Sequence, residues 1–386
     1  MKSNLSALKF VRNNRRQVWV MIVALSLTFM TMYIINFLFL TTTESFKVCF
    51  LEQPKRVAYI ALTPAAMGVE GEDYASDDEY NLAINKARDK ITDEIRMHEG
   101  ISDAVFTQTL YANYRGIVGS VGYHFPLLSK EQIPKFLNHM GAELIEGRMP
   151  EGDGEILVDE KVLNNTKMEI GGYFNESAFG QTFKVVGVLE SDYLVCVGTP
   201  MGYTNAGWYT VVLCDEANSD MTKLLGDIGI TPTENDRVYD SASEAEEYRE
   251  LVTEQLDAAL LVILMVVILF LAISILAAYV SFMRSRVNEY CLYASIGFGR
   301  NEVYGMIMRE ILLIFGISIL LGLAVTVVMM IGFGSLLLKP MGLVYKYFYP
   351  KHLFRILAAF AAIVGVLQIP ICVTINKIRT IDMIDE

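Results

Sequence analysis

The sequence has few of the residues on which small secreted proteins and fibrous proteins depend. Its 386 residues include only 5 cysteines and 10 prolines, and charged residues make up 20% of the chain. So few cysteines argue against a disulfide framework, and a hydrophobic fraction of 53% excludes a disordered or collagen-like chain. The apolar residues come in long unbroken runs, which also excludes a conventional soluble enzyme.

The sequence also lacks recognisable catalytic and metal-binding motifs. Its 4 histidines do not have the spacing of H-E-x-x-H, and neither G-x-S-x-G nor the phosphate-binding G-x-x-x-x-G-K-[ST] occurs. The acidic run 77–79 fits the start of a solvated helix better than a calcium site. We therefore expect no catalytic residue, cofactor or metal ion, and any ATP used must be bound and hydrolysed by another polypeptide.

Three of the cysteines, Cys49, Cys196 and Cys214, lie in the charged middle of the chain. An odd number of cysteines does not suit a disulfide framework. Cys196 and Cys214 could pair across two neighbouring strands, or both could remain buried free thiols, and the sequence leaves both alternatives open.

Four uncharged stretches are long enough to cross a bilayer, which takes about 20 apolar residues. They are Val18–Leu40, Ala258–Met283, Ile311–Leu338 and Ile356–Ile375. Only a helix satisfies its own backbone hydrogen bonds in hydrocarbon, so each stretch predicts a transmembrane helix. The first has too long an apolar core for a signal peptide and no small-x-small cleavage site, so we expect an uncleaved anchor.

Charge is divided unevenly along the chain. Residues 41–256 hold 37 of the 44 acidic and 17 of the 32 basic residues, a net charge of −20, whereas the rest of the chain has +8. This division favours two compartments, and the acidic surface argues against a nucleic-acid partner. Basic residues in segments 1–17, 284–310 and 376–386 predict that these segments are cytoplasmic and that 41–256 is outside, although the short outer loop 335–355 is basic too.

The outer segment reads as a mixed α/β domain. Short runs rich in β-branched and aromatic residues predict strands over Glu155–Val158, Phe183–Leu189 and Trp208–Leu213. Charged residues around a sparse apolar stripe predict a helix over Asp78–Glu99. The glycine run 116–122 predicts a turn between two strands.

Two helix termini are indicated by capping signals. Ser129 with Gln132 forms a capping box, and Gly141 suits the end of the helix that follows it. Ser241 with Glu244 forms a second box, and neither proline nor glycine occurs between it and the second apolar run. This predicts a continuous helical stalk over about 241–257 that enters the membrane, with a break near Asp257 as the alternative.

The predicted fold is an α-helical membrane protein with four transmembrane helices and a mixed α+β extracytoplasmic domain inserted between the first and second. In chain order its parts are a cytoplasmic N-terminus (1–17), helix one (18–40), the extracytoplasmic domain with its stalk (41–256), helix two (258–283), a cytoplasmic coupling segment (284–310), helix three (311–334), a short outer loop (335–355), helix four (356–375) and a cytoplasmic tail (376–386).

Polar and small residues around the coupling segment follow one another in a recognisable order along the sequence. Helical spacing over Val287–Ile296 is interrupted by Gly297 and Gly299, and a new helix follows. This part of the chain resembles the signature of FtsX/MacB-type ABC transporter permeases, through Arg286, Glu289, Ser295-Ile296-Gly297, Arg300, Val303, Glu310 and Gly322. Cys291 and Tyr293 depart from it, because the family has glycine and a basic residue there.

The outer segment is similar to the same family. The matching runs are Leu144–Pro150, Glu155–Val158, Ile170-Gly171 and Phe183–Val188, which follow the order of the MacB-like periplasmic core. Together with the arrangement of one span, an outer domain and three further spans, the resemblance extends over most of the chain.

The resemblance implies a permease subunit rather than an enzyme, working by mechanotransmission in the bacterial cytoplasmic membrane with both termini inside. The implied partners are a separate ABC ATPase subunit, a second copy or a related permease, membrane lipid, and an extracytoplasmic adaptor or hydrolase. The implied ATPase-coupling residues are Arg284, Arg286, Glu289, Ser295, Ile296, Gly297 and Arg300. The implied task is export or extraction of a peptide, lipoprotein or toxic amphiphile.

Two other functions remain open at this point. An FtsX-like regulator would transmit the motion of an ATPase to a cell-wall hydrolase. A membrane-anchored receptor or enzyme without an ATPase would need a catalytic or ligand-binding cluster in 41–256, and none can be recognised there.

Overall fold

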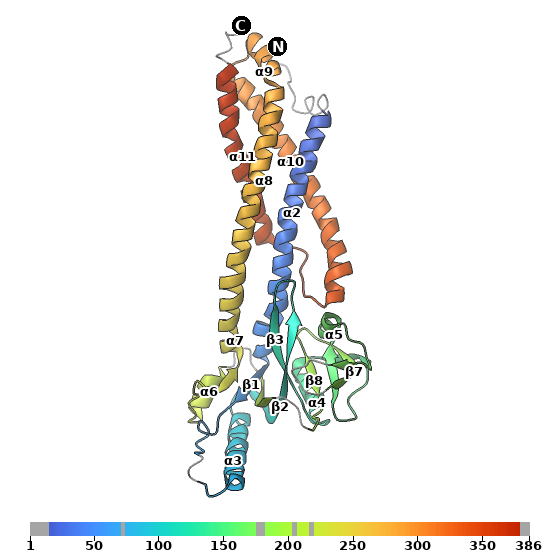
Figure 1. The fold of residues 1–386 in the computed structure, drawn as a ribbon, viewed down its shortest axis with the longest axis vertical. Coiled ribbons are helices and arrows are strands. Elements are labelled where there is room, and N and C mark those ends of the chain that lie inside the picture. The colour runs from blue at the N-terminus through green and yellow to red at the C-terminus, as the bar shows by residue number, and fades with distance from the viewer. Residues whose placement is uncertain (1–14, 71–73, 175–181, 203–206, 216–219, 379–386) are drawn as a thin grey trace. The chain divides into compact units, whose positions relative to one another are not determined.

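The computed structural model describes the chain apart from residues 1–14, 71–73, 175–181, 203–206, 216–219 and 379–386. The chain divides into two compact units (Figure 1). We call Met1–Phe39, Ala258–Gly334 and Lys346–Glu386 the helical unit, and Leu40–Asp257 with Ser335–Tyr345 the inserted domain. Most of the predicted segments 1–17 and 376–386 lies outside the described residues.

Within the described residues, four helices are long and apolar enough to cross a membrane. They are built around α2 (Arg15–Lys47), α8 (Asp257–Ser285), α10 (Arg300–Phe333) and α11 (Pro350–Ile378). Each covers all or most of one predicted span, with α10 ending at Phe333 and η6 following it, so the prediction of four long apolar helices is confirmed.

Small residues bring α2 and α10 into close contact. The Ser26 hydroxyl donates to the Ser318 carbonyl at 3.0 Å. A Cβ atom added to Gly322 would lie 3.1 Å from the Phe29 side chain, so even alanine would crowd this position. The Phe29 ring also meets Phe360 of α11 edge-on, with ring centroids 5.6 Å apart. The uncharged stretches of these helices thus pack through small residues and rings, as expected in lipid.

The inserted domain contains two five-stranded sheets. The first is antiparallel, in the order β10-β1-β9-β2-β3, and consists of β1 (Val57–Ala61), β2 (Ile101–Arg115), β3 (Ser120–Pro126), β9 (Gly207–Cys214) and β10 (Arg237–Tyr239). The second has the order β4-β7-β5-β8, with β6 paired to β7, and consists of β4 (Glu143–Gly147), β5 (Glu155–Asp159), β6 (Tyr173–Phe174), β7 (Phe183–Glu190) and β8 (Cys196–Gly198). Only β5 and β7 run parallel in the second sheet.

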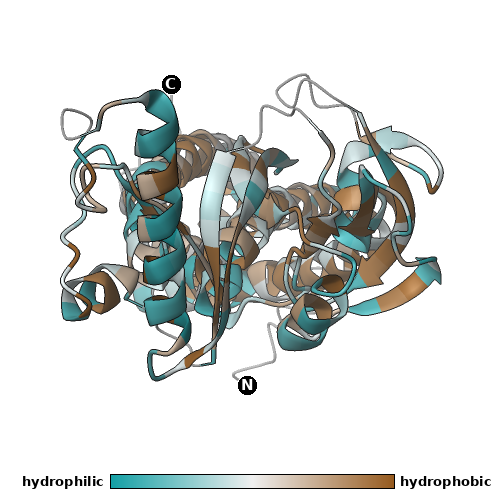
Figure 2. Cartoon of the chain, turned by 90° about the horizontal axis from the view of Figure 1, so that it is seen from below, coloured by the Kyte–Doolittle hydropathy of each residue, from teal (hydrophilic) through white to brown (hydrophobic). Residues whose placement is uncertain are grey.

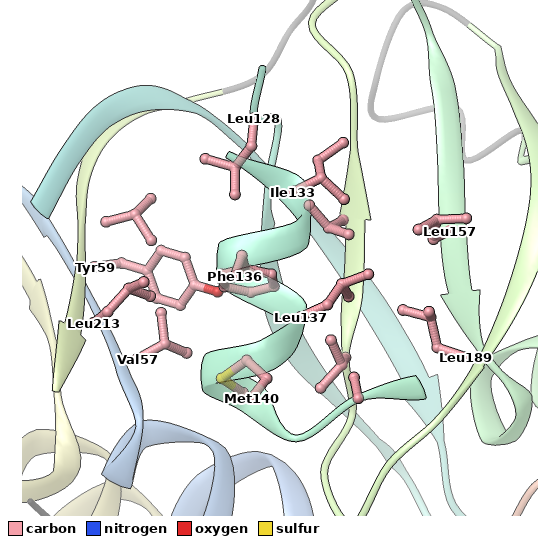
Figure 3. Packing of buried hydrophobic residues seen from close by; sticks show 14 of the residues in the cluster. Val57, Tyr59, Leu128, Ile133, Phe136, Leu137, Met140, Leu157, Leu189 and Leu213 are labelled. Atoms are coloured by element: carbon pink, nitrogen blue, oxygen red, sulfur yellow. The ribbon is translucent and has the colours of Figure 1, made fainter. Parts of the chain in front are cut away.

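The main core of the inserted domain lies around α4 (Ile133–Met140). Figure 3 shows Phe136 between the sheets, with Tyr59 of the first sheet to one side and Leu157 of the second to the other. The helix ends at Gly141, whose φ of 59° is the left-handed conformation that glycine adopts readily. The predicted end of this helix is therefore confirmed.

A second cluster covers the other face of the first sheet. There α3 (Asp77–Arg96) and α6 (Met221–Asp227) pack their apolar residues on β1, β2 and β9. Hydrophilic residues line most of α3 (Figure 2). The Ser76 hydroxyl caps α3, and the acidic residues 77–79 lie in its first turn, as the sequence predicts.

The predicted strands and the glycine turn are all present. The three runs predicted as strands correspond to β5, β7 and β9. Gly116 donates its N–H to the Gly119 carbonyl at 3.0 Å, which closes the hairpin between β2 and β3. A Cβ atom at Gly122 would overlap the Tyr111 hydroxyl, because the tyrosine ring lies across the glycine.

The stalk is helical throughout, but its cap differs from the prediction. The Asp240 carboxylate accepts from the N–H groups of Ala242 and Ser243 at 3.0 and 2.8 Å, so Asp240, and not Ser241, caps α7 (Ser241–Tyr248). Asp240 also accepts from Met221 N–H at 2.6 Å, a contact with α6 that local sequence cannot reveal. The π-helical η5 (Arg249–Leu256) then continues directly into α8, without the alternative break near Asp257.

The two cysteines that could have formed a disulfide lie on strands of different sheets. Cys196 lies on β8 of the second sheet, whereas Cys214 ends β9 of the first, and both are buried free thiols. The alternative of a pair across neighbouring strands is therefore wrong.

One boundary also differs from the prediction. Residues 335–345, expected to be part of a separate short loop, belong to the inserted domain. They include the end of η6 (Gly334–Leu338) and all of η7 (Lys339–Met341). The inserted domain is thus built from two segments of the chain rather than from 41–256 alone.

Candidate functional site

The segment between α8 and α10 forms a short helix followed by a tight turn. After α8 ends at Ser285, α9 (Val287–Ser295) begins almost at once. Gly297 has a φ of 97°, a conformation that side chains disfavour, and it turns the chain toward α10. The Glu302 carboxylate accepts from Gly299 N–H at 3.1 Å, which caps the new helix. The predicted helix and its glycine interruption are confirmed.

Arg286, at the junction of α8 and α9, is buried. Only 4% of its surface is exposed. Its Nη1 donates to Glu310 Oε2 of α10 at 2.8 Å and to the Tyr290 hydroxyl at 2.9 Å, and its Nε donates to Glu289 Oε2 at 2.9 Å. Arg286 therefore joins the end of α8, the helix α9 and the first part of α10.

Aromatic rings complete the surroundings of the guanidinium. Its carbon atom lies 4.9 Å from the centre of the Tyr290 ring and 5.5 Å from that of Phe282. Both are within the range in which a cation is attracted to a ring face. We call Arg286, Glu289, Tyr290, Glu310 and Phe282 the arginine cluster.

The arginine cluster changes the role expected for Arg286. Because its side chain is buried and satisfied, it cannot form part of an exposed docking surface, where the sequence had placed it. Removing one partner of a buried ion pair leaves an uncompensated charge, so the pair fixes the position of α9 strongly.

The remaining described residues of the predicted coupling set are exposed. Arg284, Glu289, Ser295, Ile296 and Gly297 all lie on the surface of the helical unit. Arg300 starts α10, and its side chain lies outside the described part of the structure.

Two apolar side chains that the sequence did not single out, Leu292 and Phe298, lie beside these residues or among them. Leu292 is 60% exposed and Phe298 is 37% exposed, next to Ile296 at 67%. Large apolar residues on a helix and turn that also carry charges are typical of a protein-binding surface. We call Arg284, Glu289, Leu292, Ser295, Ile296, Gly297 and Phe298 the α9 surface. Leu292 could have been found from the sequence, since it is four residues before Ile296.

Comparison with known proteins identifies this part of the chain. Residues 261–383 match the family of FtsX-like permease C-terminal domains. The chain carries an FtsX-like permease domain. This domain includes most of α8 and all of α9, α10 and α11, so the arginine cluster and the α9 surface lie within it.

Two solved structures are only distantly similar to the chain. The periplasmic region of MacB from Actinobacillus actinomycetemcomitans is 13% identical, with a TM-score of 0.26 over 50% of this chain and 92% of that one. The extracellular domain of the noncanonic ABC-type transporter YknZ from Gram-positive bacteria is 11% identical, with a TM-score of 0.24 over 47% and 98%. Likenesses at this level do not establish a shared fold. No curated protein matches the chain.

The α9 surface within the FtsX-like domain offers groups that suit binding to another protein. Among the described residues, no group of three or more His, Cys, Asp or Glu side chains could hold a metal ion. The arginine cluster is internally satisfied, and the α9 surface offers apolar side chains, two charges and a glycine turn. Such a surface suits docking into a cleft of another protein.

Proposed function

We propose that this chain is the permease subunit of a bacterial ABC transporter, located in the cytoplasmic membrane with both termini inside. It works as a dimer, with a second copy or a related permease, and docks a separate ATPase through the α9 surface. The ATP cycle drives a conformational change of the inserted domain outside the membrane. The task is export or extraction of a peptide, lipoprotein or toxic amphiphile.

One observation carries the proposal. The FtsX-like domain contains a short helix that is held rigidly on its inner side by the arginine cluster and presents exposed Leu292 and Ile296 on its outer side. A docking element benefits from a rigid base under its exposed apolar surface. The helix is already ordered before the partner binds, so binding loses less conformational entropy.

The continuous helix from α7 through η5 to α8 supports the second half of the proposal. It runs from Ser241 to Ser285 and ends one residue before Arg286. A displacement of α9 by a docked partner therefore acts directly on the end of this helix. The other end begins at Asp240, which is buried in the inserted domain.

The proposal is tested by replacing Ile296 with aspartate in the full chain. I296D places a charge at the centre of the exposed apolar group, which should disrupt a hydrophobic docking contact without touching the arginine cluster. We expect the variant to lose co-purification with the ATPase and its stimulation of ATP hydrolysis, both by about tenfold or more.

L82D is the matched control, because Leu82 on α3 of the inserted domain is 54% exposed and undergoes the same change. It should leave ATPase binding intact. Normal ATPase binding and stimulation by I296D would show that the α9 surface is not the docking site.

A further inference from the structure

The segment that follows α10 is packed as tightly as a core element. Leu338, the last residue of η6, is 2% exposed, and Leu343, in the connection that leads to α11, is 5% exposed. Leu343 N–H donates to the Leu338 carbonyl at 3.0 Å and closes the turn around η7. Within the inserted domain, this turn packs against α5 (Glu160–Thr166).

Asn165, at the end of α5, connects this turn to the hairpin of β2 and β3. Its Nδ2 donates to the Met341 carbonyl at 3.0 Å and to the Arg115 carbonyl at 2.8 Å. Its Oδ1 accepts from Arg115 N–H at 2.9 Å. One amide side chain thus binds the backbone of two segments that are more than two hundred residues apart in sequence.

Two hydroxyl groups add further bonds to the same turn. Tyr114, only 1% exposed, donates its hydroxyl to the Gly342 carbonyl. Ser45, fully buried, accepts from Val344 N–H at 3.0 Å and donates to the Val344 carbonyl at 3.2 Å. Each of these partners belongs to the inserted domain.

Gly342 fits its place only because it has no side chain. Its φ is 65°, and a Cβ atom would lie 1.9 Å from the Lys161 carbonyl oxygen and 2.9 Å from Asn165 N. Backbone atoms cannot move aside as a flexible side chain can, so any other residue would push the turn away from α5.

The helix α5 is itself firmly attached to the second sheet. Asp159, the last residue of β5, is fully buried and caps α5 by accepting from Lys161 N–H at 2.9 Å. The Ser191 hydroxyl donates to the other carboxylate oxygen of Asp159 at 2.7 Å. A force on the turn at 341–344 therefore reaches β5 through α5 and reaches β2 through Asn165 and Tyr114.

We propose that Ser45, Tyr114, Asn165 and Gly342 are positioning residues that latch the α10–α11 connection onto the inserted domain. We call these four residues the latch. Through it, movement of α10 reaches the inserted domain by a second route, in addition to the helix 241–285. This extension rests on the proposed function, since it assigns the latch a part in transmitting the motion driven by the ATPase.

The latch has the properties of a mechanical attachment. Its bonds are made to backbone atoms at 341, 342 and 344, so the path of the chain is held and not merely its side chains. The bonds are made between neutral groups: that of Tyr114 is buried, those of Ser45 are partly buried and those of Asn165 lie near the surface. Bonds between neutral groups do not depend on pH between the titration ranges of carboxyl and tyrosine groups.

The experiment uses hydrogen–deuterium exchange on the full chain in lipid nanodiscs, first without any ATPase. In N165A, amides within 335–345 should exchange roughly tenfold faster or more, because three hydrogen bonds are lost. N164A is the matched control, since Asn164 is the neighbouring residue in α5 and its side chain makes none of the hydrogen bonds described here. G342A should release the same amides by a different means, through overlap with the Lys161 carbonyl.

The second stage adds the co-purified ATPase and compares exchange of the 114–120 hairpin with and without Mg-ATP. N164A should keep the ATP-dependent change of the wild type, whereas N165A and G342A should lose at least about half of it. Unchanged exchange of 335–345 in both N165A and G342A would overturn the latch itself. Faster exchange there with an undiminished ATP response would overturn its part in transmission.

These exchange data also distinguish failure of the proposed function from failure of the latch. A wild-type chain that binds no ATPase would show no ATP response at all and would remove the transmission role with it. The first stage needs no ATPase, so its result still decides whether the latch holds the turn.

Discussion

The two ends of α10 are held by different chemistry. Near its start, Glu310 pairs with Arg286 in a cluster built on charge, with both residues at most 5% exposed. After its end, the latch holds residues 341–344 through neutral donors and backbone carbonyls. The first attachment lies in the helical unit and the second in the inserted domain.

This difference predicts how each attachment fails. A buried charge that loses its partner has no good alternative, so the arginine cluster should fail abruptly when one member is removed. When a neutral amide side chain of the latch is removed, water can hydrogen-bond to the freed carbonyl groups once the turn opens. Each single substitution should therefore weaken the latch only in part. The predictions below test this contrast, starting with the largest effect.

The largest effect is expected when Glu310 is replaced by alanine. E310A leaves the Arg286 guanidinium buried with only Glu289 as a charged partner, and we expect a loss of about 3–5 kcal/mol of unfolding free energy. Thermal unfolding of the full chain in detergent micelles measures it.

The double variant R286M/E310M is the control for this prediction. It removes both charges and fills the space with apolar side chains, so it should be much closer to wild type than E310A. A double variant as unstable as E310A would show that packing, and not charge, holds the cluster together.

The second effect concerns a buried histidine that the inserted domain keeps neutral. His124 of β3 lies among tyrosine rings, with centroids 4.4 Å from Tyr239, 4.8 Å from Tyr111 and 5.1 Å from Tyr59. Burial lowers the pKa of His124 to about 3, and the positive charge of Arg237 acts in the same direction.

The sign of the pH dependence follows from this shift. The folded chain keeps His124 neutral down to about pH 3, whereas the unfolded chain takes up the proton below its ordinary pKa of about 6.5. The contribution of neutral His124 to the free energy of unfolding is therefore fully present above about pH 6.5. It falls by about 1.4 kcal/mol per pH unit as the pH drops toward 3.

The variant H124F keeps a ring in the aromatic cluster but cannot titrate. Between pH 6.5 and 5, its unfolding free energy should fall by about 2 kcal/mol less than that of the wild type. Chemical denaturation at both pH values measures the difference. Equal pH slopes for the two proteins would mean that the pKa of His124 is the same in the folded and the unfolded chain.

The smallest effect concerns the start of the helix that joins the two units in sequence. Asp240 accepts the capping bonds of α7, and the prediction from sequence had assigned that role to Ser241. D240A should cost about 1 kcal/mol or somewhat more, because the bond from Met221 N–H is lost as well, whereas S241A should change little. Thermal unfolding of both variants decides between the two residues, and a larger effect for S241A would restore the original assignment.

Sequence patterns located most elements of the fold. The four long helices follow from uncharged runs, because a bilayer admits no other single-segment structure. The strands β5, β7 and β9 and the helix end at Gly141 follow from local composition and glycine conformation. The cap of α7 was placed one residue too late, although the capping bonds of Asp240 to Ala242 and Ser243 are local; the sequence could not show the further bond from Met221 N–H, which lies in another element.

The candidate site was located only in part. Local spacing predicted α9, the glycine turn and most of the exposed residues beside them. It could not show that Arg286 faces inward, because that depends on Glu310, which lies 24 residues further along the chain. Leu292 was overlooked although its spacing to Ile296 indicated it, and Phe298 was overlooked because it lies in the turn after α9.

The sequence by itself determined that the chain has four apolar helices, an acidic α/β domain and no catalytic motif. These properties depend on the composition and period of neighbouring residues, which the chain carries locally. The tertiary structure alone decided that Arg286 is buried, that Cys196 and Cys214 lie on different sheets and that residues 335–345 belong to the inserted domain. Each of these depends on contacts between distant segments, and such contacts form only where the folded backbone brings their partners together.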